Sequence, residues 1–210
     1  MPFQKIDFLL INFDRALRII SGQAKASREN PANAIADLNL SDKQQSHSAA
    51  LMRVNHVGEI CAQALYDAQG QFAQTAAISE QFSHSGMEEE DHLAWSSQRI
   101  TELNSRTSLL NPLWYAGAYA CGMIAARCGD VASLGFVVET ERQVAAHLAG
   151  HLEKLPAEDL KSRAIVEQMR QDEIAHGAAA QALGASELPA PIKAAMGLMA
   201  KLMTTTAYYV

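Results

Sequence analysis

Two copies of the pattern Glu-x-x-His occur in the chain, and each follows a lone glutamate by a similar interval, 30 residues from Glu59 to Glu89 and 32 from Glu141 to Glu173. Residues three apart project from one face of an α-helix, so a single Glu-x-x-His can offer both side chains to one metal ion. Four helices carrying Glu, Glu-x-x-His, Glu and Glu-x-x-His can together hold two metal ions. The six candidate metal ligands are Glu59, Glu89, His92, Glu141, Glu173 and His176.

One Glu-x-x-His alone is weak evidence, because charged helices produce the pattern by chance on a solvated face. Two copies with matched upstream glutamates favour a dinuclear site. A ligand set of four carboxylates and two imidazoles is rich in oxygen and suits iron or manganese better than zinc or copper(I). With iron, such a site can activate O₂.

Acidic residues beside the proposed ligands are candidates for orienting the histidines. A metal-bound imidazole usually donates its second N–H to a carboxylate or a carbonyl. Asp91 and Asp172 each lie next to a ligand-bearing turn. We predict this role for both, the alternative for each being a solvated helix charge.

Other polar residues near the motifs receive less specific predictions. His147 follows Glu141 by six residues and could support a ligand or relay a proton. His151, one turn later, is expected at the surface. The spacing leaves Glu88, Glu90 and Glu139 as ordinary polar positions.

The segments that must position these side chains have helical character. Apolar residues recur with an approximate helical period, and proline-rich or glycine-rich breaks separate the segments. The predicted helices cover residues 42–74, 76–104, 132–154 and 157–183, with core candidates Met87, Leu93, Trp95 and Ile100 in the second. We therefore predict an all-α protein with a ferritin-like four-helix bundle.

Three further segments flank or interrupt the bundle of this single predicted domain. Residues 1–41 form an amphipathic helix, Phe3 to Ile20, and a linker, Ser27 to Ser41; residues 42–184 form the bundle; and residues 185–210 form a C-terminal helix. Residues 109–126 carry no charge and include Trp114, Tyr115 and Tyr119. At 18 residues with an internal proline, this apolar crossover segment fits a helix lying in a membrane surface better than a spanning one. The alternative is a buried crossover helix.

Composition limits the partners. A chain of 210 residues suits one domain, and its net charge of −6 without a basic stripe argues against nucleic acid. The three cysteines, Cys61, Cys121 and Cys128, show no metal-binding spacing and are expected to be reduced and buried.

The segment from Arg53 to Glu59 resembles the RVNHxGE signature of the demethoxyubiquinone (3-demethoxyubiquinol) hydroxylase family, the ferritin-like di-iron carboxylate proteins of ubiquinone biosynthesis. Similar blocks follow through most of the chain. They are 88–92, 139–144, 147–151 and 172–176, with shorter similarities at 14–18 and 201–204.

This resemblance implies a di-iron monooxygenase that hydroxylates the ring of a polyprenylated demethoxyubiquinol, 2-polyprenyl-3-methyl-6-methoxy-1,4-benzoquinol, with O₂ and an external electron donor. The family's ligands fall on the six residues chosen by spacing, and its pattern favours Glu141 over Glu139. It also implies peripheral attachment to the cytoplasmic face of the bacterial inner membrane. A homo-oligomer or a ubiquinone-biosynthesis complex is compatible with the apolar segments.

Two other classes of function fit parts of the pattern. A ferritin-like ferroxidase or peroxidase would use a similar site but would not need an uncharged aromatic segment. A membrane-associated helical adaptor would leave the glutamates solvated and the histidines incidental. Metal content and product analysis separate these alternatives.

Overall fold

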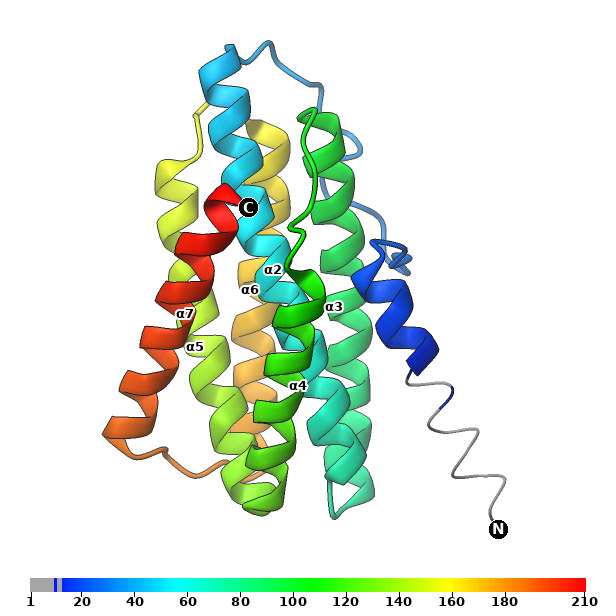
Figure 1. Ribbon diagram of the computed structural model, residues 1–210, viewed down its shortest axis with the longest axis vertical. Coiled ribbons are helices and arrows are strands. Elements are labelled where there is room, and N and C mark those ends of the chain that lie inside the picture. The colour runs from blue at the N-terminus through cyan, green and yellow to red at the C-terminus, as the bar shows by residue number, and fades with distance from the viewer. Residues whose placement is uncertain (1–9, 11–12) are drawn as a thin grey trace.

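The computed structural model describes residue 10 and residues 13–210, and its regular elements there are helices (Figure 1). The predicted N-terminal helix lies in part outside the described residues, but residues 13–20 are helical. The other helices are α2 (Asp42–Phe72), α3 (Ala76–Glu102), α4 (Asn111–Arg127), α5 (Asp130–Lys154), α6 (Leu160–Ala182) and α7 (Ala190–Tyr209). The all-α, ferritin-like prediction is confirmed.

The bundle consists of two helix pairs, α2 with α3 and α5 with α6, which pack together through α3 and α6 and through α2 and α5 (Figure 1). Polar side chains begin three of these helices. Ser41 and Gln44 form a capping box at α2, Thr75 accepts from a backbone N–H of α3, and Asp159 caps α6. Such caps satisfy N–H groups that helical hydrogen bonds leave free.

Helix α4 is the apolar crossover between the two pairs, and it lies against α2. Gly122 permits this approach, since a Cβ at that position would come within 2.9 Å of the Ala68 Cβ atom. Tyr115 and Ala126 are also buried, while Leu113 and Ile124 are about two-thirds exposed, at 64% and 65%. The segment is thus a crossover helix as the alternative predicted, but it is only half-buried.

Helix α7 packs along α2 and α5, where Ala207 is buried beside Val54 and Val57. Its other side exposes Leu198, Met199 and Leu202. In the described part of the chain, every helix is too short or too polar to cross a membrane.

The core confirms most of the predicted apolar positions. Leu93, Trp95 and Ile100 are buried, whereas Met87 is 54% exposed and was wrongly assigned to the core. Met87 lies two residues before Glu89, and the face that carries Glu89 is the one turned into the bundle. The burial of the cysteines was also predicted wrongly: Cys121 and Cys128 are exposed on and after α4, and Cys61 is half-buried.

Candidate metal centre

The four bundle helices bring all six predicted metal ligands together in the core. Each is at most 3% exposed. Atoms within 4.8 Å of one another define two overlapping groups: Glu59, Glu89, His92 and Glu173, and then Glu89, Glu141, Glu173 and His176. Glu89 and Glu173 belong to both groups, so each could contribute oxygen ligands to a cation held by either group.

Each histidine turns one ring nitrogen toward these carboxylates and the other away from them. Nδ1 of His92 lies 3.2 Å from Glu89 and 3.6 Å from Glu173. Nδ1 of His176 lies 3.3 Å from Glu89 and 3.7 Å from Glu173. Nδ1 is therefore the nitrogen that can bind a metal, and Nε2 is left to donate to another group.

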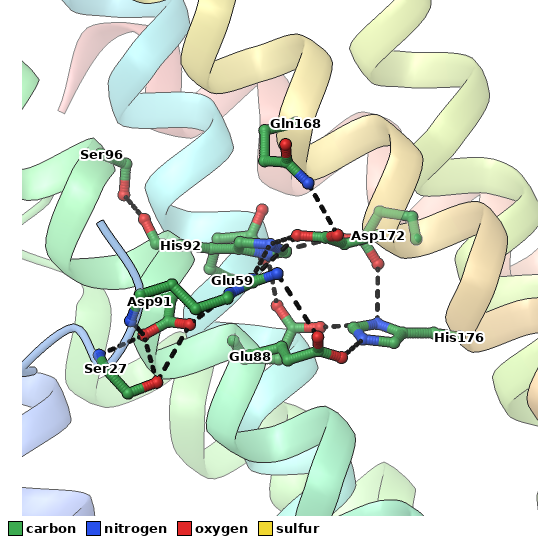
Figure 2. A network of polar contacts seen from close by, with 12 residues as sticks. Ser27, Glu59, Glu88, Asp91, His92, Ser96, Gln168, Asp172 and His176 are labelled. Atoms are coloured by element: carbon green, nitrogen blue, oxygen red, sulfur yellow. Dashed lines mark hydrogen bonds and ion pairs between the residues drawn. The ribbon is translucent and has the colours of Figure 1, made fainter. Parts of the chain in front are cut away.

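The acidic residue that faces each Nε2 atom comes from the helix that carries the other Glu-x-x-His motif (Figure 2). Asp172, which precedes Glu173, lies 2.9 Å from Nε2 of His92. Glu88, which precedes Glu89, lies 2.8 Å from Nε2 of His176. Each acidic residue orients the histidine of the opposite motif, as predicted for Asp172. For Glu88, the prediction of an ordinary polar position was wrong, although the acidic residue before each motif glutamate was a usable signal.

Asp91 has a different role from the predicted one. Its carboxylate accepts from the backbone N–H of Ser27 at 2.5 Å and from the Ser27 hydroxyl at 3.1 Å (Figure 2). It also accepts from Nε of Arg28 at 2.5 Å. It therefore fixes the N-terminal linker and not a histidine. The reason is helical geometry: Asp91 lies two residues after Glu89 and so faces away from the ligand cluster.

Tyr66 is a further residue that the sequence analysis missed. It lies on α2 two turns after Glu59, is buried, and donates its hydroxyl to Oε1 of Glu141. Burial, together with the charge of Glu141, raises the pKa of Tyr66 well above its ordinary value, so the tyrosine stays protonated as a donor. The interval of seven residues from Glu59 places Tyr66 on the same face of α2, and this spacing could have predicted its position at the cluster.

The electrostatics of the cluster reflect many acids in a small, dry volume. Burial, reinforced by repulsion from Glu89, raises the pKa of Glu59 well above the usual range. Burial and Glu173 do the same for Glu141. Burial would lower the pKa of His92, but the charge of Glu89 and the bond to Asp172 outweigh it and raise that pKa well above normal. A positive charge is therefore strongly favoured at the centre of this buried cluster.

Unpartnered oxygens test whether these residues fit a cation. Carboxylate oxygens of Glu59, Glu89, Glu141 and Glu173 are buried without a hydrogen-bond partner, as is Nδ1 of His176. An unpaired buried carboxylate oxygen is costly, and a cation at the centre of the cluster would supply the missing partner. The donor set is oxygen-rich with two imidazoles, so it fits iron or manganese.

The remaining polar residues lie around the cluster. His147 borders a cavity beside α2 and α7, and its ring centroid lies 3.9 Å from that of His151. His151 is 3% exposed, so its predicted surface position is wrong. Glu139 is buried against Arg142 and Gln143, and Glu90 pairs with Arg15.

The fold and the cluster together define a carboxylate-histidine four-helix protein with a candidate dinuclear metal centre. The family model described as ubiquinone biosynthesis protein COQ7 matches residues 46–207. This chain belongs to that family.

Similar proteins extend along nearly the whole chain. A 3-demethoxyubiquinol 3-hydroxylase of Herbaspirillum seropedicae is 62% identical over 205 residues, covering 98% of this chain and 99% of its own. The enzymes of the same name from Herminiimonas arsenicoxydans and Ralstonia pickettii are 60% and 56% identical, covering 97% of this chain each and 97% and 99% of their own lengths.

Proposed function

We propose that the protein is an O₂-dependent monooxygenase that hydroxylates the ring of a polyprenylated demethoxyubiquinol in ubiquinone biosynthesis. The observation that carries this proposal is the burial of six matched carboxylate and histidine ligands beside a cavity that reaches Glu59. Membership of the COQ7 family and the activity for which its relatives are named support the same reaction.

The proposed cofactor is a pair of iron ions. Glu59 and His92 would serve one ion, Glu141 and His176 the other, and Glu89 and Glu173 both. When bound, the irons would supply O₂ activation, with one oxygen atom going to the ring and the other leaving as water. The overall reaction consumes two electrons, which we assign to an external donor, and two protons.

The substrate pocket proposed here is the cavity between α2, α5 and α7, of about 490 Å³. The buried residues Glu59 and Asn55 are among those that line it, and Oδ1 of Asn55 has no hydrogen-bond partner. Val144, Leu148 and Met203 line the walls, which suits an aromatic ring that carries an apolar tail. Asn55 and His147 can hydrogen-bond the two ring hydroxyls and thereby fix which carbon faces the metals.

The tail gives a reason for membrane contact. Exposed apolar side chains lie on α4, at Leu113 and Ile124, and on α7, at Leu198, Met199 and Leu202. We propose that these faces rest on the cytoplasmic side of the inner membrane, from which the prenyl chain enters the cavity. Association with a second copy or a biosynthetic complex would use the same apolar surface.

The alternatives fit the site less well. A helical adaptor with solvated glutamates disagrees with ligands that are at most 3% exposed. A ferroxidase or peroxidase needs no apolar cavity ending at the cluster. The three classes differ in product, so a single assay separates them.

The assay is anaerobic loading with Fe(II), followed by a short-chain demethoxyubiquinol, a chemical reductant and O₂, with mass spectrometry of the product. Iron-dependent gain of one oxygen atom is expected. Iron oxidation without a hydroxylated product would favour a ferroxidase, and protein that binds no iron would overturn the metal centre.

A further inference from the structure

One arginine from the N-terminal linker joins the outer partners of both metal-site histidines. Arg28 lies before the segment matched by the family model, which begins at residue 46. Its Nη2 atom donates to Asp172 at 2.9 Å, and its Nη1 atom lies 3.4 Å from Glu88. Asp172 and Glu88 are the carboxylates that face Nε2 of His92 and of His176 (Figure 2).

The position of Arg28 is itself fixed from several sides. Its Nε atom donates to Asp91 at 2.5 Å, and the side chain of Asp91 is only 1% exposed. The guanidinium also lies over the ring of Trp95, 5.0 Å from its centroid. The backbone N–H and hydroxyl of Ser27 hold the adjacent residue to the same carboxylate. An arginine held by a buried carboxylate and an aromatic face has little freedom to move.

The shape of the guanidinium suits this arrangement. Its five N–H donors point in fixed, coplanar directions, so one side chain can contact three carboxylates at once. A lysine is a compact charge on a flexible stem and can satisfy one or two of them. Glu88 and Asp172 also face their histidines with one oxygen each, so fixing each carboxylate fixes the ring that it orients.

We infer that Arg28 is a positioning residue for the metal centre, acting through Asp172 and Glu88 to hold both histidines in their metal-binding orientation. This role rests on the proposed metal site and adds to it a residue from the N-terminal linker. The linker, held to α3 by the contact of Ser27 with Asp91, thus supports the proposed metal centre. By fixing the outer partners of the histidines, it slows the loss of bound metal.

The test uses Co(II), whose visible absorption reports ligand geometry, in full-length protein. We expect Arg28→Ala to change the Co(II) spectrum and to lose metal to a chelator up to about 10-fold faster, the low end of the affinity loss caused by removing an outer partner of a metal ligand, because Arg28 acts one residue further out. Arg18→Ala is the control, since Arg18 lies on the N-terminal helix that precedes the linker and pairs there with exposed Asp14. It should behave as the wild type.

Other outcomes have distinct meanings. Arg28→Ala with unchanged spectrum and release rate, in a protein of wild-type helicity, would overturn the role of Arg28 and leave the metal centre intact. Wild-type protein that binds no Co(II) would overturn both. If Arg28→Ala does not fold, Arg28→Lys decides: an altered spectrum and faster release support the role, and wild-type behaviour contradicts it.

Discussion

Glu88 on α3 lies 2.8 Å from Nε2 of His176 on α6, and it therefore belongs to the opposite motif from the histidine it orients. Asp172 and His92 repeat the relationship in the other direction, at 2.9 Å. The hydrogen bond to His176 is the main reason that the pKa of Glu88 lies below its ordinary value. These two contacts link α3 to α6 beside the ligand cluster, so neither histidine ring can rotate unless its acidic partner on the other helix moves as well.

Replacing Glu88 tests this relationship. Glu88→Gln keeps the size of the side chain but removes the charge that would make His176 a stronger ligand in the proposed metal centre. We expect Fe(II) affinity to fall about 10- to 100-fold. Glu90→Gln is the control, because Glu90 pairs with Arg15 and faces away from the histidines. Equal affinities in equilibrium titrations of the two variants would contradict the assigned role of Glu88.

Removal of a shared ligand should separate catalysis from folding. Glu173→Ala takes away a carboxylate common to both ligand groups, so metal content and product formation should fall to background. The metal-free fold should be as stable as the wild type or more stable, since both oxygens of Glu173 are buried without partners.

The matched control for this variant is Glu167→Ala, which removes an exposed carboxylate paired with Arg170 on the same helix. Circular dichroism, metal analysis and product mass spectrometry would be compared across both variants. A Glu173→Ala protein with wild-type iron and activity would exclude Glu173 as a ligand.

Sequence periodicity predicted the helices well, because the pattern that defines a helix face is local. The same local geometry selected the six clustered residues, as Glu89 and His92 must share a face if their segment is helical. Arg28 could not be found in this way. It lies in a linker, and its contacts with Asp172 and Glu88 exist only after the linker docks on α3 and α6.

The error at His151 has a tertiary cause of the same kind. A position one turn beyond His147 reads as solvated when α5 is considered alone. The start of α2 and the end of α7 cover this part of α5, where His47 contacts both the Lys154 carbonyl and Tyr208. The sequence of one helix does not show which other elements will cover each of its faces, so the burial of His151 could not be predicted from α5 alone.

The cavity can be tested by filling it. Gly58 borders the cavity, and a Cβ at that position would meet no atom within 4 Å, so Gly58→Leu should place its side chain in the pocket. We expect KM for the quinol to rise about 10-fold or kcat to fall with little change in bound iron. Helix stability should not suffer, because leucine is a better helix former than glycine by about 1 kcal/mol.

A second glycine provides the comparison. Gly117 on α4 also has open space around it and does not line the cavity. Gly117→Leu should therefore leave KM for a detergent-solubilised, short-chain quinol unchanged. If the two variants have the same kinetics, the substrate does not use this cavity.

Stability should fall in mild acid because a buried histidine is held neutral. Burial, with His147 and the Lys154 ammonium nearby, lowers the pKa of His151 to about 3. The unfolded chain takes up this proton at its ordinary pKa of about 6.5. The stability associated with neutral His151 is therefore fully present above pH 6.5 and declines as the pH falls toward 3, by up to about 1.4 kcal/mol per pH unit.

His151→Leu should remove this part of the acid sensitivity. Nδ1 of His151 is buried without a partner, so the substitution sacrifices no hydrogen bond at that atom. Urea unfolding of both proteins, in the same metal state at pH 7.5 and pH 5.5, gives the comparison. We expect the variant to lose less unfolding free energy between the two pH values, by about 1 kcal/mol. Equal losses in the two proteins would show that His151 takes up its proton as readily in the folded chain as in the unfolded chain. That result would contradict the lowered pKa expected from the burial of His151 on α5 beneath α2 and α7.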